Sequence, residues 1–168
     1  MTIHATHPFA DPDPDPVRRL RGRLGGAVAL VTGGDADGRA GLTVTSLMVA
    51  NGEPARLLLL VDPDSDLAEV VGRTGRAVVQ LLSWPHRDLA EAFAGTAPAP
   101  GGPFRAGTFE DTPWGPRLAD SPTWAGVSVE SAAEVGWSTL LTCVVEDLTL
   151  GDDESPLVHR RGRYVRPS

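Results

Sequence analysis

The stretch "GLTVTSLMVANGEPARLLLLV", residues 41–61, decides the fold of this chain. Its first part alternates apolar residues with Thr43 and Thr45, which is the period-two pattern of a half-buried strand. Its last part, residues 56–61, is almost pure leucine and predicts a core strand. The loop "ANGEP" separates the two parts, so the stretch predicts two strands of a β-rich domain.

Composition supports the same fold class. A chain of 168 residues is long enough for one domain with its own core. The 19 glycines and 15 prolines interrupt the sequence so often that only short helices fit between them. We therefore expect an all-β or β-rich α+β domain, with many short strands joined by turns.

Charge and cysteine content exclude several classes of protein. The net charge is −7, and the basic residues do not gather on one predicted helix face, so nucleic-acid binding is not expected. The single cysteine, Cys143, cannot form an internal disulfide. No segment has the pattern of a signal peptide or the length of a membrane span. We expect a soluble cytoplasmic protein that does not contact membranes.

The positions of the glycines, prolines and other turn residues predict the order of helices and strands. Residues 1–16 repeat Asp-Pro and are predicted to be a disordered tail, so that the ordered domain covers residues 17–168. Residues 33–41 predict a hairpin with a long tip, and residues 95–116 predict a functional loop or a packing arm. Short helices are predicted at 17–24, from Ser65 onward and at 85–95, and strands at 27–32, 42–46, 56–61, 78–82, 123–135, 136–150 and 156–165.

The sequence contains no self-sufficient catalytic set. It has no Cys/His cluster with zinc spacing, no phosphate loop ending in Lys-Ser/Thr and no dinucleotide fingerprint, so no metal site is expected. His86 neighbours Arg87 and Asp88, but adjacent helical residues point in different directions. His159 falls on a late strand, where an exposed or edge histidine is common. If the chain is an enzyme, a cofactor supplies its chemistry.

Two groups of hydroxyl residues are candidate ligand contacts. Thr43, Thr45 and Ser46 suit the polar edge of a planar ring, although threonine is also an ordinary strand residue that faces water. Ser65 begins a predicted helix whose amides could hold a phosphate. The alternative is a simple N-cap, because the aspartates at 62, 64 and 66 would repel such an anion.

The order of four motifs resembles the flavin reductase-like family of FMN-binding split barrels. These motifs are "GLTVTS" at 41–46, Asp-x-x-Ser at 62–65, "LAEAFAG" at 89–95 and "PLVHRRGRY" at 156–164. The resemblance implies a Greek-key split β-barrel with short flanking helices, usually a homodimer, that binds FMN or FAD near the dimer interface. It also implies an NAD(P)H-dependent flavin reductase, often the partner of a separate monooxygenase.

The resemblance also implies which residues contact the cofactors. Thr43, Val44, Thr45 and Ser46 would line the isoalloxazine edge and the ribityl chain, through backbone as much as side chains. Asp62 and Ser65 would lie at the ribityl-phosphate end. The protein would hold N5 of the flavin against C4 of the nicotinamide, since the hydride transfer belongs to the two cofactors.

The sequence departs from the family pattern in three places. Gly136-Trp137-Ser138 replaces the usual Gly-Asp-His, so either Trp137 stacks on a ring at the nicotinamide side or the use of pyridine nucleotide is altered or lost. Pro103-Phe104 replaces Arg-Phe, with Arg105 displaced by one position, which either removes an expected phosphate partner or shifts it to Arg105. Asn51 and Glu53 replace residues of a Ser-x-x-Pro-Pro loop.

These departures leave three functional readings open. The first is the reductase, with NADH or NADPH as co-substrate. The second is an FMN-binding carrier or sensor without NAD(P)H oxidation activity, because Gly136-Trp137-Ser138 lacks the histidine of the family's Gly-Asp-His. The third is a dimeric scaffold that has lost the flavin, because acidic residues surround the expected phosphate site.

Overall fold

A computed structural model describes residues 15–166. The predicted tail lies outside the described residues except for its last two positions, which start the first helix. Asp15 is the N-cap of α1 (Pro16–Leu24), because its side chain accepts a 2.9 Å hydrogen bond from the Val17 amide. The first helix therefore begins one residue before the predicted boundary at residue 17. Within residues 15–166, no helix is long and apolar enough to cross a membrane.

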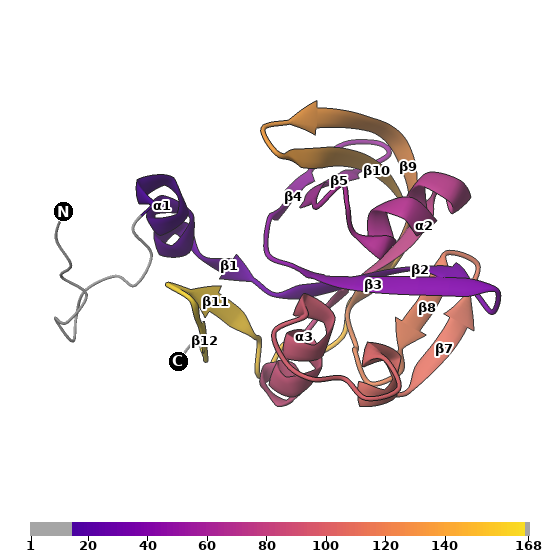
Figure 1. The fold of residues 1–168 in the computed structure, drawn as a ribbon. Coiled ribbons are helices and arrows are strands. Elements are labelled where there is room, and N and C mark those ends of the chain that lie inside the picture. Colours follow the sequence, from indigo (N-terminus) through magenta and orange to yellow (C-terminus); the bar gives the residue numbers. More distant parts are fainter. Residues whose placement is uncertain (1–14, 167–168) are drawn as a thin grey trace, which may run out of the picture.

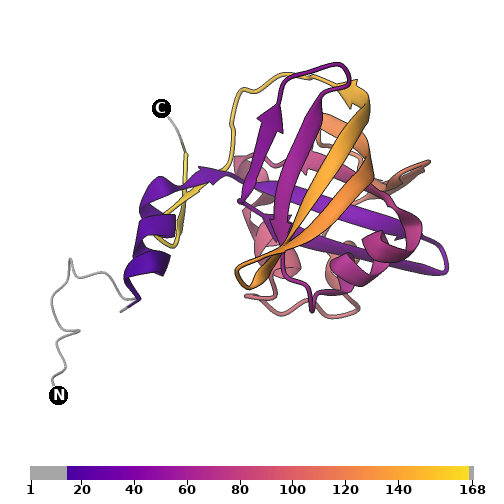
Figure 2. The same cartoon turned by 90° about the horizontal axis from the view of Figure 1, so that it is seen from above.

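One curled, fully antiparallel sheet of seven strands dominates the structure (Figures 1 and 2). Its spatial order is β3-β2-β6-β9-β10-β5-β4, in which neighbours are often distant in sequence. This arrangement confirms the predicted β-rich split barrel. The strands are β2 (Ala29–Asp35), β3 (Gly38–Val44), β4 (Leu47–Ala50), β5 (Arg56–Val61), β6 (Arg76–Leu81), β9 (Trp124–Val135) and β10 (Ser138–Thr149).

The leucine-rich strand β5 has two different faces. Leu57, Leu59 and Val61 are buried in the main core, under α2 (Asp66–Thr74). Leu58 is half-buried and Leu60 is exposed, because alternate side chains of a strand point to opposite faces. The predicted core strand is confirmed, but half of its leucines lie on the outer face of the barrel.

Smaller elements flank the sheet. α3 (Arg87–Ala94) buries Leu89 and Phe93, as their spacing predicted, in a second core below β3. The chain ends form a small sheet of order β1-β11-β12, beside α1. The remaining elements are β1 (Gly26–Ala27), η1 (Trp84–His86), η2 (Pro103–Ala106), β7 (Phe109–Thr112), β8 (Gly115–Leu118), β11 (Val158–Arg160) and β12 (Arg163–Val165).

The structure corrects two turns. The hairpin tip at residues 33–41 is short, because β2 and β3 stay paired out to Asp35 and Gly38 and leave a two-residue turn. The predicted final strand, 156–165, is itself a hairpin that turns at Arg161 and Gly162, both with positive φ. The segment 95–116 is a packing arm, whose Phe104 and Phe109 stack edge-on against Phe93 of α3.

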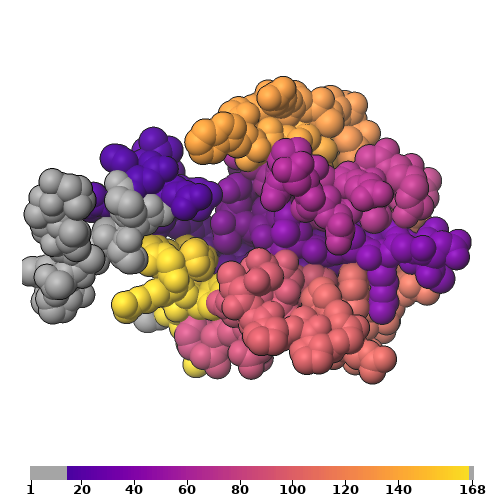
Figure 3. Space-filling model, in the orientation of Figure 1, coloured from indigo at the N-terminus to yellow at the C-terminus, as the bar shows by residue number. Residues whose placement is uncertain are grey.

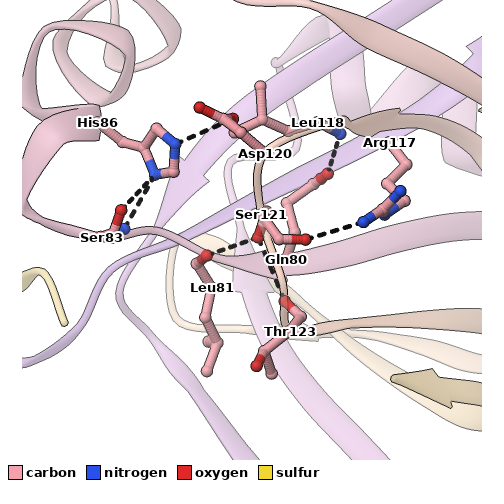
Figure 4. Close-up of polar contacts among 9 residues, drawn as sticks. All are labelled: Gln80, Leu81, Ser83, His86, Arg117, Leu118, Asp120, Ser121 and Thr123. Carbon is pink, nitrogen blue, oxygen red and sulfur yellow. Dashed lines mark hydrogen bonds and ion pairs between the residues drawn. The ribbon is translucent and has the colours of Figure 1, made fainter. Parts of the chain in front are cut away.

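A buried glutamine, Gln80, joins three strands, and Figure 4 shows its contact with Leu118. The Gln80 amide donates to the carbonyl oxygen of Leu30 at 2.9 Å and to the hydroxyl of Thr32 at 3.0 Å. Its oxygen accepts from the Leu118 amide at 2.7 Å. Gln80 and Thr32 are fully buried, so this side chain satisfies polar groups that water cannot reach.

His86 fastens the loop after β8 to η1. Its Nδ1 accepts a 3.0 Å hydrogen bond from the Ser83 amide, and its Nε2 lies 3.1 Å from the Asp120 carboxylate (Figure 4). The Ser83 hydroxyl also lies 3.0 Å from Nδ1. Because Ser83 and His86 close a capping box at the start of η1, this Ser-His-Asp set has a structural role.

Cys143 is expected to be unreactive in the folded protein. Its side chain is fully buried on β10, and burial raises the pKa of the thiol to about 11. A thiol reagent at neutral pH should therefore modify Cys143 only after denaturation, because the thiolate is the reactive form. Mass spectrometry of protein treated with iodoacetamide, with and without urea, checks this expectation, and rapid modification of the native protein would contradict it.

Candidate functional site

The first part of the site is a break in the sheet between β3 and β4. Thr45 and Ser46 form this break and lie outside the strand ladder, with both side chains half-buried. The Leu60 amide donates a 2.9 Å hydrogen bond to the Ser46 carbonyl, which ties the break to the end of β5. The hydroxyls of Thr45 and Ser46 and their local backbone are therefore placed at the rim of the sheet.

On the face shown in Figure 3, the surface formed by β3 and β4 is recessed. The β9–β10 hairpin overhangs it from above, the yellow C-terminal strands border it on the left, and α3 borders it from below. We call this hollow the recess. The recess thus brings together β3 and β4, the β9–β10 hairpin and the C-terminal strands, which are distant in sequence.

Thr43 and Val44 are placed differently from Thr45 and Ser46. The Thr43 hydroxyl donates a 2.7 Å hydrogen bond to the Ala90 carbonyl, so it ties β3 to α3. Val44 is 3% exposed and packs in the main core, so only its backbone could meet a ligand. The alternation predicted for this strand is thus present, with Thr43 on the α3 side and Val44 inside.

Asp62 and Ser65 build the start of α2. The Asp62 carboxylate accepts a 2.9 Å hydrogen bond from the Asp64 amide. The Ser65 hydroxyl donates to the Asp62 carbonyl at 2.6 Å and accepts from the Ala68 amide at 3.2 Å. Ser65 is therefore the N-cap of α2, which is the predicted alternative to a phosphate site. Its hydroxyl already forms hydrogen bonds within the chain.

Trp137 lies at the tip of the β9–β10 hairpin. Val135 pairs with Ser138, so Gly136 and Trp137 form a two-residue turn, with Gly136 at φ 57°. Thr139 pairs with Val61, which places this tip just beyond the end of β5, where Asp62 follows. The Trp137 side chain is 95% exposed, so it does not serve packing within residues 15–166.

Arg105 lies apart from the start of α2. It is exposed on η2 and lines a cavity of about 420 Å³ together with Asp88 and Glu91 of α3. α3 lies below β3 in Figure 1 and α2 lies above it, and η2 packs against α3. The structure thus brings Thr45, Ser46, Asp62 and Trp137 to one end of the barrel and places Arg105 on the α3 side.

A cluster around His159 is not predicted by the sequence. His159 pairs with Tyr164 across the C-terminal hairpin, and their ring centroids are 5.4 Å apart. The Tyr164 hydroxyl faces the Glu91 carboxylate of α3, and burial together with the charge and hydrogen bond of Glu91 raises the Tyr164 pKa to about 12. No local pattern predicts this cluster, because its members come from three elements.

The stability of the protein is expected to fall in mild acid because of His159. Burial lowers the pKa of its imidazole, Glu91 opposes this shift and Arg21 adds to it. Since the folded pKa lies below the ordinary value of about 6.5, the unfolded chain binds a proton first as the pH falls. The neutral His159 therefore contributes fully to the folding stability above the ordinary pKa. This contribution is lost as the pH falls through the lower pKa of the folded state.

Thermal unfolding measures this effect when it is followed from about pH 8 to about pH 5, an interval that includes the ordinary histidine pKa. The melting temperature should decrease less in His159→Phe than in the wild type over this interval. Equal decreases in the two proteins would contradict the assignment to His159.

Known proteins resemble this chain over most of its length. Residues 21–168 match the family described as "Flavin reductase like domain". An FMN reductase (NADH) of Methylorubrum extorquens is 32% identical over 155 residues, covering 89% of this chain and 86% of that protein. The reductase component of 4-hydroxyphenylacetate 3-monooxygenase from Pseudomonas aeruginosa is 26% identical, covering 89% of each protein. The solved structure of the NADH:FAD oxidoreductase SgcE6 from Streptomyces globisporus has a TM-score of 0.82 at 20% identity, covering 93% of this chain and 96% of that chain.

Proposed function

Because this chain belongs to the flavin reductase-like domain family, we propose that it is an NAD(P)H-dependent flavin reductase that uses FMN or FAD in the recess. The observation that carries this proposal is the break at Thr45 and Ser46, where two hydroxyls leave the strand ladder beside a hollow surface. A flavin needs donors and acceptors along its polar edge, and this break supplies both from backbone and side chains.

The residues at the recess fit a flavin. Thr45 and Ser46 would bind the ring edge, and Asp62, Ser65 and the amides that open α2 would lie toward the ribityl-phosphate. Thr43 and Val44 would act through their positions in β3, the first by fixing α3 and the second through its backbone. Arg105 would have to reach a phosphate from the α3 side. When bound, the flavin and the nicotinamide supply the hydride chemistry, and the protein aligns them and excludes water.

A direct assay tests the reductase. Purified protein is mixed with FMN or FAD, and the oxidation of NADH and NADPH is followed by absorbance. We expect turnover with at least one nucleotide above a blank that contains flavin alone. No turnover with any of the four combinations would overturn the proposal.

A second candidate is an FMN carrier or sensor without reductase activity. It is favoured by one observation, the sequence Gly136-Trp137-Ser138 at the hairpin tip, which lacks the histidine of the family's Gly-Asp-His. Tight FMN binding without any response to nucleotide would support this candidate. Measurable FMN affinity, with or without reductase activity, would exclude the third reading, a scaffold that has lost the flavin.

We further propose that the protein is a homodimer. The outer apolar face is formed by Met48, Leu58, Leu60 and Leu140, which are cross-strand or same-face neighbours on β4, β5 and β10. Met48 is 65% exposed and Leu60 is 37% exposed in the single chain. Contiguous apolar surface of this kind is typical of protein–protein interfaces, and a second copy would cover it.

The partner and compartment follow from the same activity. Reduced flavin is useful only to a protein that consumes it, so a separate monooxygenase is the proposed acceptor. The sequence similarity to a monooxygenase reductase component supports this partner. We place the protein in the cytoplasm, where NADH and NADPH are available and where a free thiol such as Cys143 stays reduced.

Trp137→Ala is expected to separate activity from stability. Because the indole is 95% exposed, its removal should leave the melting temperature unchanged. If the indole stacks on a nicotinamide or flavin ring, its loss should lower kcat/KM for the nucleotide by about tenfold. Steady-state kinetics and thermal unfolding of the same preparations check both parts. Unchanged kinetics would show that Trp137 does not contact either cofactor.

A further inference from the structure

The C-terminal hairpin lies against the Thr45 end of the recess. Gly26 of β1 pairs with His159 of β11, and a Cβ atom added to Gly26 would lie 3.1 Å from the Thr45 carbonyl oxygen. Directly paired residues of antiparallel strands point their side chains to the same face. The imidazole of His159 therefore lies on the face of the small sheet that fronts Thr45, and the missing side chain of Gly26 leaves space next to it.

Several elements hold this imidazole in place. Tyr164 of β12 packs edge-on against it, with an interplanar angle of 70°. Tyr164 interacts in turn with Glu91 of α3, and the Glu91 carboxylate accepts a hydrogen bond from the Thr96 hydroxyl. Because a second strand and a helix fix the ring, His159 is preorganised and does not need to be ordered by a ligand.

The nitrogens of His159 remain available to a ligand. The side chain is half-buried, yet no residue between 15 and 166 forms a hydrogen bond with its imidazole. Burial lowers its pKa, so at neutral pH the ring is neutral and offers one N–H donor and one nitrogen acceptor. A half-buried ring with both groups unused is well suited to the polar edge of a bound molecule.

We propose that His159 contacts the flavin bound at Thr45 and Ser46 and forms a hydrogen bond with the polar edge of its ring system. This role rests on the proposed flavin site. It gives the recess two walls, with the Trp137 hairpin above and the C-terminal hairpin on the left (Figure 3). The chain lacks a histidine at residues 136–138, and His159 supplies one from the other wall.

Two substitutions at His159 distinguish ligand contact from packing. His159→Phe keeps a ring against Tyr164 but removes both nitrogens, whereas His159→Gln keeps a hydrogen-bonding group but removes the ring. The control is Arg163→Gln, an exposed residue next to Tyr164 whose side chain points to the opposite face of the hairpin. FMN affinity is measured by flavin fluorescence, and folding by thermal unfolding at the same pH.

For a ligand contact, His159→Phe should bind FMN about tenfold more weakly while it unfolds near the wild-type temperature. His159→Gln should retain affinity within about threefold despite a lower melting temperature. Arg163→Gln should match the wild type in both measurements.

Three results would overturn the role of His159. The first is His159→Phe binding FMN as tightly as the wild type, and the second is affinity that follows the melting temperature across the variants. The third is a wild type that binds no flavin, which would overturn the proposed function as well. The first two results, obtained with a wild type that binds FMN, would leave the flavin site intact and remove only His159 from it.

Discussion

Gln80→Leu is expected to lower the free energy of unfolding by about 3 kcal/mol, because a buried donor or acceptor without a partner costs about 1 to 3 kcal/mol. Leucine has nearly the same volume as glutamine, so the substitution leaves little cavity. It does leave the buried Leu118 amide without an acceptor and removes a donor from the Thr32 hydroxyl and the Leu30 carbonyl. For a domain of this size the melting temperature should fall by roughly 6 to 12 °C.

Urea unfolding followed by tryptophan fluorescence measures this loss. The matched control is Leu81→Ala at the next position of β6, where the side chain is 39% exposed and points away from Gln80. The control should lose about 1 kcal/mol or less. A loss in Gln80→Leu no larger than the control would mean that water or a shifted side chain satisfies these groups.

The second large effect concerns the outer apolar face. The double variant Met48→Lys/Leu60→Lys should dissociate the proposed homodimer, with a loss of at least about a hundredfold in dimer affinity. An interface related by a twofold axis carries each substitution twice, so four ammonium groups would have to leave water without partners. Analytical ultracentrifugation over a range of protein concentrations should show the mass of one chain where the wild type shows two.

The control for this experiment is Leu24→Lys, on a residue of α1 that is 76% exposed in the single chain. It adds a charge at an exposed leucine on α1, which is not one of the strands that form the outer apolar face, and it should remain a dimer. A double variant that stays dimeric would exclude this face as the interface. If the monomeric variant also loses FMN affinity, the flavin site needs residues from both subunits.

Local patterns predict those parts of the fold that are determined locally. The Ser65 cap is set by residues three positions apart, and α3 is indicated by Leu89 and Phe93 four positions apart. Strand β5 is recognisable from its composition alone. The exposure of Leu60 is not predictable in this way, because it depends on which elements cover the outer face of the finished sheet.

Long-range contacts explain what the sequence does not predict. Val28 interrupts the predicted strand 27–32 because its amide bonds the Leu157 carbonyl and its carbonyl accepts from the Leu82 amide. The Thr43 hydroxyl is used by Ala90, 47 positions away. His159 looks like an ordinary edge residue until β1 and α3 are placed around it. The sequence thus proposes residues 43–46, 62 and 65 as ligand contacts, which stay predictions, whereas the C-terminal wall depends on contacts that no local pattern indicates.

The pairing of β1 with β11 has a practical consequence for joining this protein to another. Because β12 is the last strand of the small sheet that borders the recess, and it pairs with the strand that carries His159, a fusion at the C-terminus would be joined close to His159. A monooxygenase attached there by a short flexible linker would receive reduced flavin at high effective concentration, before free diffusion and reaction with oxygen remove it. For the same reason, a bulky purification tag at the C-terminus is expected to obstruct the recess.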